Sequence, residues 1–260
     1  MSPITCEIAV RRASDHLAGL LPADERIALD QHLASCAHCS ALMEQLRSTI
    51  AVLRNRPGLD VPDVLQELIA DADDTRSADL VRHLPQLYSL AVALDPTTAD
   101  DLVQETISRA LADPTVDTGD AALAATLTDI ARRRQPALES PSTPPLGDDP
   151  DADEPELFYP AFYSDAPDPG AWIDPPVAWG DSRILQPDDD VLTTELFSVV
   201  DAALGELDAI DRSLLTLVDI DGVPFSQAAM VLELARSDAR KRLADARFAV
   251  RAALDQYVRT

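Results

Sequence analysis

Four side chains near the N-terminus have the types and the spacing of a metal site. Cys6 stands alone, and His32, Cys36 and Cys39 follow as H-x3-C-x2-C. Residues four apart share one face of a helix, so a helix ending near Cys36 presents His32 and Cys36 together. The two-residue gap lets Cys36 and Cys39 bind the same ion. Three thiolates and one imidazole favour Zn2+ in a closed, tetrahedral site. His38 is a poorer candidate ligand because it directly precedes Cys39.

A closed site of this kind has no open position for an activated water, so we expect it to be structural. The alternative is three buried cysteines and a surface histidine. Thiolates at a helix N-terminus also react readily with oxidants, which leaves a redox switch open beside an inert site. The sequence shows no Ser/His/Asp set and no phosphate-binding loop, and we do not expect an enzyme.

The composition predicts that helices position these residues. The chain has 260 residues, of which 46% are hydrophobic but only 4% aromatic, and it contains 8 glycines. Ala/Leu-rich usage of this kind favours an all-α fold over a sheet. Thr98 and Asp101 suggest a capping box for one of the helices. Three- and four-residue apolar spacing predicts helices at 7–20, 23–35, 39–54, a short segment after Pro62, 78–94, 98–112, 120–134, 191–205, 208–220, 225–233 and 236–257.

Residues 138–190 differ from the rest of the chain. They hold fourteen acids against a single base, Arg183, and residues 136–187 contain 12 of the 20 prolines. We predict an acidic Pro-rich linker that separates domains at 1–75, 76–137 and 191–260. Its six aromatic residues favour partial docking, against the alternative of a disordered tether; they are Phe158, Tyr159, Phe162, Tyr163, Trp172 and Trp179.

The net charge of -25 excludes some partners. A molecule this acidic repels nucleic acid and anionic membranes at long range, which disfavours sequence-independent DNA binding. No segment approaches the ~18 apolar residues of a spanning helix, and the N-terminus lacks the pattern of a signal peptide. We therefore expect a cytoplasmic protein without a membrane partner.

Residues 1–70 resemble the zinc-binding anti-sigma domain of bacteria, through Cys6, the H-x3-C-x2-C motif and the helix after Pro62. The resemblance implies a three-helix zinc bundle and a docking helix that wedges between the two domains of a sigma factor. In redox-sensing members the upstream cysteine pairs with one of the last two, here Cys6 with Cys36 or Cys39. Most relatives continue into a membrane span, and this chain does not.

The D-L-V-Q-E-T run at 101–106 is similar to the region-two helix of extracytoplasmic-function sigma factors. The resemblance implies that the polar side of this helix binds the clamp of RNA polymerase, through Asp101, Gln104, Glu105 and Arg109. Two departures argue against promoter melting. Thr126 stands where a tryptophan is usual, and the basic stretch that should follow stops at Arg134.

Residues 204–254 resemble sigma region four, a helix-turn-helix in which Gly222 supplies a turn. The last helix combines an apolar stripe with basic edges, which favours DNA contact through Arg236, Arg240, Lys241, Arg242 and Arg247. Against this, Glu233 replaces a turn glycine, and Asp238 and Asp245 also depart from the family pattern. The alternative is an arginine edge paired with the chain's own acids.

Together these segments predict an autoinhibited sigma-like transcription regulator. Its expected partners are the RNA polymerase core and promoter DNA, and the zinc domain is expected to contact the sigma-like domains of the same chain. Covalent fusion raises the effective concentration of the inhibitor to roughly millimolar, so a weak interface stays closed. The alternative is a decoy or adaptor that binds polymerase, or another sigma or anti-sigma factor, without reading DNA.

Overall fold

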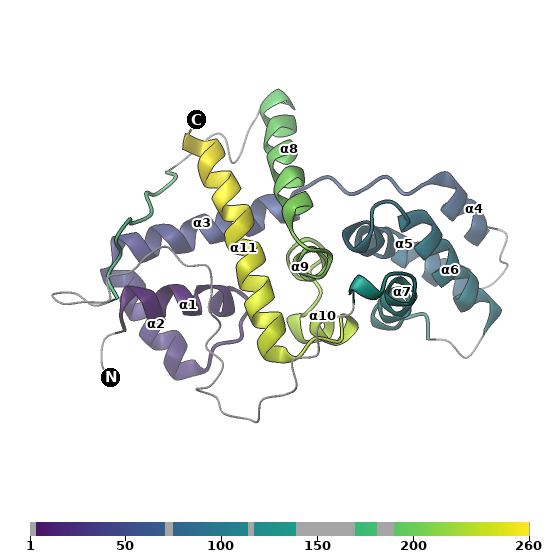
Figure 1. The fold of residues 1–260 in the computed structure, drawn as a ribbon, viewed down its shortest axis with the longest axis horizontal. Coiled ribbons are helices and arrows are strands. Elements are labelled where there is room, and N and C mark those ends of the chain that lie inside the picture. The colour runs from purple at the N-terminus through teal and green to yellow at the C-terminus, as the bar shows by residue number, and fades with distance from the viewer. Residues whose placement is uncertain (1–3, 71–74, 114–116, 139–169, 181–189, 260) are drawn as a thin grey trace. The chain divides into compact units, whose positions relative to one another are not determined.

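The computed structural model describes residues 4–70, 75–113, 117–138, 170–180 and 190–259 (Figure 1). Within these ranges the protein is all-α and has no strand, as the composition predicted. No helix of these ranges is long and apolar enough to cross a membrane. The elements are α1 (Cys6–Leu17), α2 (Ala23–Ser35), α3 (Ala37–Arg54), α4 (Asp63–Ala70), α5 (Thr75–Leu94), α6 (Ala99–Ala112), α7 (Asp120–Arg134), η1 (Pro136–Leu138), α8 (Asp190–Glu206), α9 (Ala209–Leu215), η2 (Thr216–Ile220), α10 (Phe225–Val231) and α11 (Arg236–Arg259).

The helices form two compact units, each built from segments far apart in sequence. Among the described residues, unit 1 combines 4–54, 170–180, 190–206 and 240–259, and unit 2 combines 55–70, 75–113, 117–138 and 207–239. Unit 1 thus holds α1 to α3, α8 and α11 from Arg240 onward, and unit 2 holds α4 to α7, α9 and α10. The consecutive domain boundaries at 75, 137 and 190 stay a prediction.

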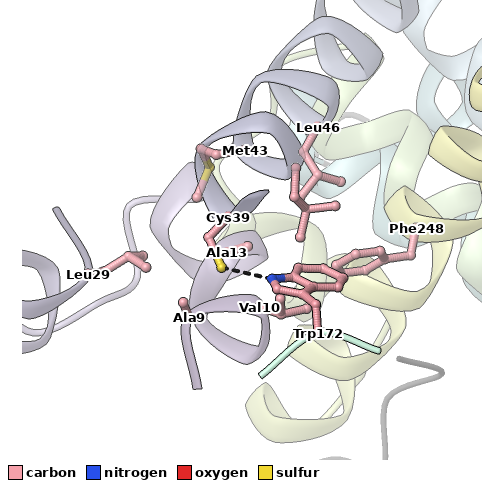
Figure 2. Packing of buried hydrophobic residues seen from close by; sticks show 10 residues of the cluster. Ala9, Val10, Ala13, Leu29, Cys39, Met43, Leu46, Trp172 and Phe248 are labelled. Carbon is pink, nitrogen blue, oxygen red and sulfur yellow. Dashed lines mark hydrogen bonds between the residues drawn. The ribbon is translucent and has the colours of Figure 1, made fainter. Parts of the chain in front are cut away.

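In unit 1, α1, α2 and α3 pack against one another in pairs. Thr5 caps α1 by accepting a hydrogen bond from the Ile8 amide at 3.3 Å. Cys36 has extended backbone angles (φ -113°, ψ 105°) that end α2, and α3 begins one residue later. The bundle core also includes two aromatic residues from elsewhere in the chain (Figure 2), and its buried members are Ala9, Val10, Ala13, Leu29, Cys39, Leu42, Met43, Leu46, Trp172 and Phe248.

Two of the six linker aromatics lie in the described segment 170–180, and both dock, which is one of the two outcomes that the sequence left open. Trp172 is buried in the bundle core, and the indole of Trp179 donates a hydrogen bond to Asp255 on α11 at 2.6 Å. The other four lie outside the described residues, namely Phe158, Tyr159, Phe162 and Tyr163.

In unit 2, α5 packs against α6, α7 and α9, and α10 packs against α7. The short helix α4 packs against both α5 and α6, and it buries Leu65 and Ile69. Gly222 has the positive φ of 71° that its predicted turn requires. Glu233, between α10 and α11, also has a positive φ, 49°, although it is not a glycine.

One local prediction in unit 2 was wrong. Thr98 is the N-cap residue of α6 but makes no capping bond, because its hydroxyl donates to Asp95 at 2.7 Å instead. Asp95 also accepts from the amide and hydroxyl of Thr97, and these bonds lower the pKa of Asp95. The helix predicted at 208–220 is present as α9 and η2; in η2 the helical turn is wider, and the Asp221 amide donates to the carbonyl of Thr216 at 2.9 Å.

Candidate metal centre

The four predicted ligands lie together in unit 1. The ligand atoms of Cys6, His32, Cys36 and Cys39 all fall within 4.8 Å of one another, and the Cys6 and Cys36 sulfurs are 3.8 Å apart. Helix α1 begins at Cys6, His32 lies in the last turn of α2, and Cys39 lies in the first turn of α3. The short break at Cys36 therefore brings three helix ends to one point.

The histidine side chain fits a metal ligand. His32 Nε2 is buried and has no hydrogen-bond partner among the residues that the structure describes. A buried polar nitrogen without a partner costs free energy, and coordination to a cation removes that cost. His38, the weaker candidate, is exposed and is not part of the cluster.

The thiol electrostatics also favour a cation. Burial raises the pKa of Cys6 and, more strongly, that of Cys39. Burial acts in the same direction on Cys36, but hydrogen bonds, first from the Cys39 backbone amide, outweigh it and lower the pKa of Cys36. Three thiolates this close repel one another, and a divalent cation compensates for that charge. The donor set and its closed geometry fit Zn2+.

An indole completes the surroundings of the site. The Nε1–H group of Trp172 donates a hydrogen bond to the Cys39 sulfur at 3.2 Å (Figure 2). Trp172 is 8% exposed and shares the bundle core with Phe248 of α11. The sequence marked Trp172 only as an aromatic that docks, because no local pattern links it to a cysteine 133 residues away.

The zinc bundle contacts several predicted DNA-binding residues. Arg240 binds Asp15 of α1 through three hydrogen bonds; its Nε lies 3.1 Å from each carboxylate oxygen, and its Nη2 binds Oδ2. These bonds raise the pKa of Arg240. Arg247 is only 1% exposed and donates to the carbonyl and the hydroxyl of Ser14 at 2.8 and 2.9 Å.

The other three predicted DNA-binding residues differ in exposure. Arg236 is exposed and belongs to unit 2, whereas Lys241 and Arg242 are partly exposed in unit 1. The sequence missed Asp15, which is 7% exposed. The sequence did hold one indication, since an acid at a buried position of α1 requires a partner that compensates its charge. No local pattern, however, identified Arg240 as that partner.

The predicted polymerase-binding residues share one face of α6. Asp101, Gln104 and Arg109 are exposed, and Glu105 is partly exposed. Glu105 binds Arg109 in its own helix and Arg134 of α7, and the hydrogen bond from Arg134 chiefly lowers the pKa of Glu105. Helix α4 packs against α6 and leaves this face accessible.

The fold and the site together define a helical zinc-binding protein. Residues 6–40 match the family model described as Putative zinc-finger. The match includes all four clustered ligands, so the N-terminus carries a zinc finger of the anti-sigma-factor type. No curated protein and no solved structure matches the chain.

Proposed function

We propose that the protein is a transcription regulator and not an enzyme, a sigma-like chain whose fused zinc bundle masks its own DNA-binding helix. The observation that carries the proposal is the pairing of α1 with α11. Arg240 and Arg247 donate hydrogen bonds to Asp15 and Ser14 of α1. Both arginines belong to the edge of α11 that resembles the DNA-contacting edge of sigma region four. Phosphate contact needs these guanidinium groups free, so these contacts support the proposal of an inhibited state.

The α6 surface supports the second half of the proposal. Its exposed polar residues are those that resemble the polymerase-binding helix of region two, and α4 leaves them accessible. In this proposal the chain binds the RNA polymerase core through α6 while the zinc bundle controls whether α11 reaches DNA. Loss of zinc, or a partner that displaces α1, releases the helix.

Two measurements on the full chain test the proposal. The immobilised protein is first tested for capture of RNA polymerase core, beside Gln104→Arg, which places a charge on the exposed face of α6. The captured complex is then tested for retention of a random pool of double-stranded DNA, before and after zinc removal. We expect Gln104→Arg to lose capture, and DNA to be retained only after zinc removal. Equal capture by both proteins, or DNA retention that is independent of zinc, contradicts the proposal.

A second candidate is a decoy that binds polymerase, or another sigma or anti-sigma factor, without reading DNA. The observation that favours it is the turn before α11. Glu233 occupies a left-handed position that costs a non-glycine residue free energy, and it is held there by an ion pair with Arg132. This acid would face phosphate at the start of the helix. Polymerase capture without DNA retention in either zinc state supports the decoy.

A further inference from the structure

The segment of residues 170–180, which we call the strap, is tied first to the start of α1. The carbonyl of Gly170 accepts a hydrogen bond from the Glu7 amide at 3.0 Å, one residue after the ligand Cys6. Gly170 has a positive φ of 77°, and a Cβ there would lie 2.8 Å from the Cβ of Thr5. Only glycine fits this position without displacement, so the start of the strap is fixed against the metal site.

The middle of the strap contacts a metal ligand directly. Trp172 donates its indole N–H to the Cys39 sulfur (Figure 2). A hydrogen bond to a thiolate is charge-assisted, and outer partners of this kind orient a ligand and adjust how strongly it donates to the metal. Trp172 therefore acts on the ion through Cys39, as a positioning residue.

The end of the strap reaches α11. The Val177 carbonyl accepts a hydrogen bond from Gln45 Nε2 at 2.7 Å, and Gln45 Oε1 accepts from Arg251 of α11 at 2.8 Å. The Trp179 indole donates to Asp255 of the same helix at 2.6 Å. Gln45 is 1% exposed, so its side-chain amide provides a hydrogen-bond partner for both the Val177 carbonyl and the Arg251 guanidinium in a buried environment. The strap thus contacts the metal site at one end and α11 at the other.

We propose that the strap is a working part of the zinc site, in which Trp172 strengthens zinc binding through Cys39 and couples the metal to α11. Zinc binding and strap docking then stabilise each other, because coupling between two equilibria is reciprocal. A thiolate bound to zinc is a stronger hydrogen-bond acceptor than a neutral thiol. The inference goes beyond the proposed function, since it requires neither polymerase nor DNA.

The test compares Trp172→Phe with Trp179→Phe in the full chain. Both variants keep a large ring and lose an indole N–H, but only the first N–H reaches a metal ligand. Competition with a chromophoric chelator measures zinc affinity, and we expect Trp172→Phe to bind zinc about tenfold more weakly, as for other outer partners of zinc ligands. We expect a smaller loss of zinc affinity in Trp179→Phe, because its N–H contacts α11 and acts on the ion only through strap docking.

Cobalt gives a spectroscopic readout that packing alone does not change. In the Co2+-substituted protein, loss of the N–H···S bond raises the energy of the sulfur lone pair. The thiolate-to-cobalt charge-transfer band should therefore move to longer wavelength in Trp172→Phe and stay in place in Trp179→Phe. Unchanged zinc affinity and an unchanged band in Trp172→Phe overturn the proposal, as do equal losses of zinc affinity in both variants.

A third measurement remains available if Trp172→Phe does not fold. Trp172 is the only tryptophan in the Trp179→Phe protein, because the chain has two. Zinc removal should shift its fluorescence to longer wavelength as the indole leaves the core. A spectrum that is the same with and without zinc overturns the coupling.

Discussion

The ion pair between Asp15 and Arg240 gives the sharpest quantitative prediction. Asp15→Asn preserves the shape of the side chain but removes its charge, and it turns an amide group toward the guanidinium. Hydrogen bonds to charged groups contribute about 1.5–3 kcal/mol each, and solvent weakens those of partly exposed groups. Since 46% of the Arg240 side chain is exposed, we take the lower end, about 1.5 kcal/mol. The opening of α11 from α1 should therefore become about tenfold more frequent.

Amide hydrogen exchange of residues 240–259, followed by mass spectrometry on the zinc-loaded chain, measures this opening. The matched control is Glu44→Gln on α3, which removes an exposed carboxylate paired with Arg47 and should change exchange little. Exchange in Asp15→Asn that equals that of wild type refutes the reasoning, because the pair would then contribute nothing to holding α11. Equal acceleration in both variants also refutes it, since the effect would not belong to this contact.

The remaining predictions concern the metal ligands and one buried acid. Removing a ligand in His32→Ala should leave less than one zinc per chain after dialysis against EDTA, measured by mass spectrometry of the metal, while His38→Ala keeps its zinc. Mild oxidation of the zinc-free protein with diamide, which accepts the two electrons and two protons of the thiols, should give chiefly a Cys6–Cys36 disulfide, since these sulfurs are 3.8 Å apart. Peptide mapping identifies the disulfide, and a different principal pair contradicts this prediction. Burial raises the pKa of Asp221 to about 7, so unit 2 should lose stability as pH rises from about 4 to 7, on the order of 4 kcal/mol in total. Asp221→Asn should remove this loss and raise the urea midpoint of unit 2 at pH 8, and an equal midpoint in both proteins contradicts it.

The sequence predicted the helices and the ligand set well because both depend on local patterns. Apolar spacing and prolines located every described α-helix to within a few residues, and the ligand spacing identified the four clustered side chains. The capping box at Thr98 failed because a competing bond to Asp95 formed, and the sequence did not predict the wider helical turn of η2. Periodicity does not distinguish these alternatives.

The contacts that connect distant segments were beyond sequence reasoning. Trp172 meets Cys39 across 133 residues, and Arg240 meets Asp15 across 225. A basic edge on α11 has the same pattern whether it faces phosphate or an acid of its own chain, because only the folded arrangement selects the partner. The sequence therefore marked the arginines as a basic edge and left both interpretations of their partner open.

In the proposed inhibited state, a zinc-stabilised bundle holds the arginine edge of α11. Amide exchange of the full wild-type chain, measured before and after zinc removal by a chelator, tests this directly. We expect residues 240–259 to lose protection together with α1, α2 and α3, while α5, α6 and α7 of unit 2 keep theirs. Loss of protection in α1 to α3 with unchanged exchange in residues 240–259 would mean that the bundle does not hold α11.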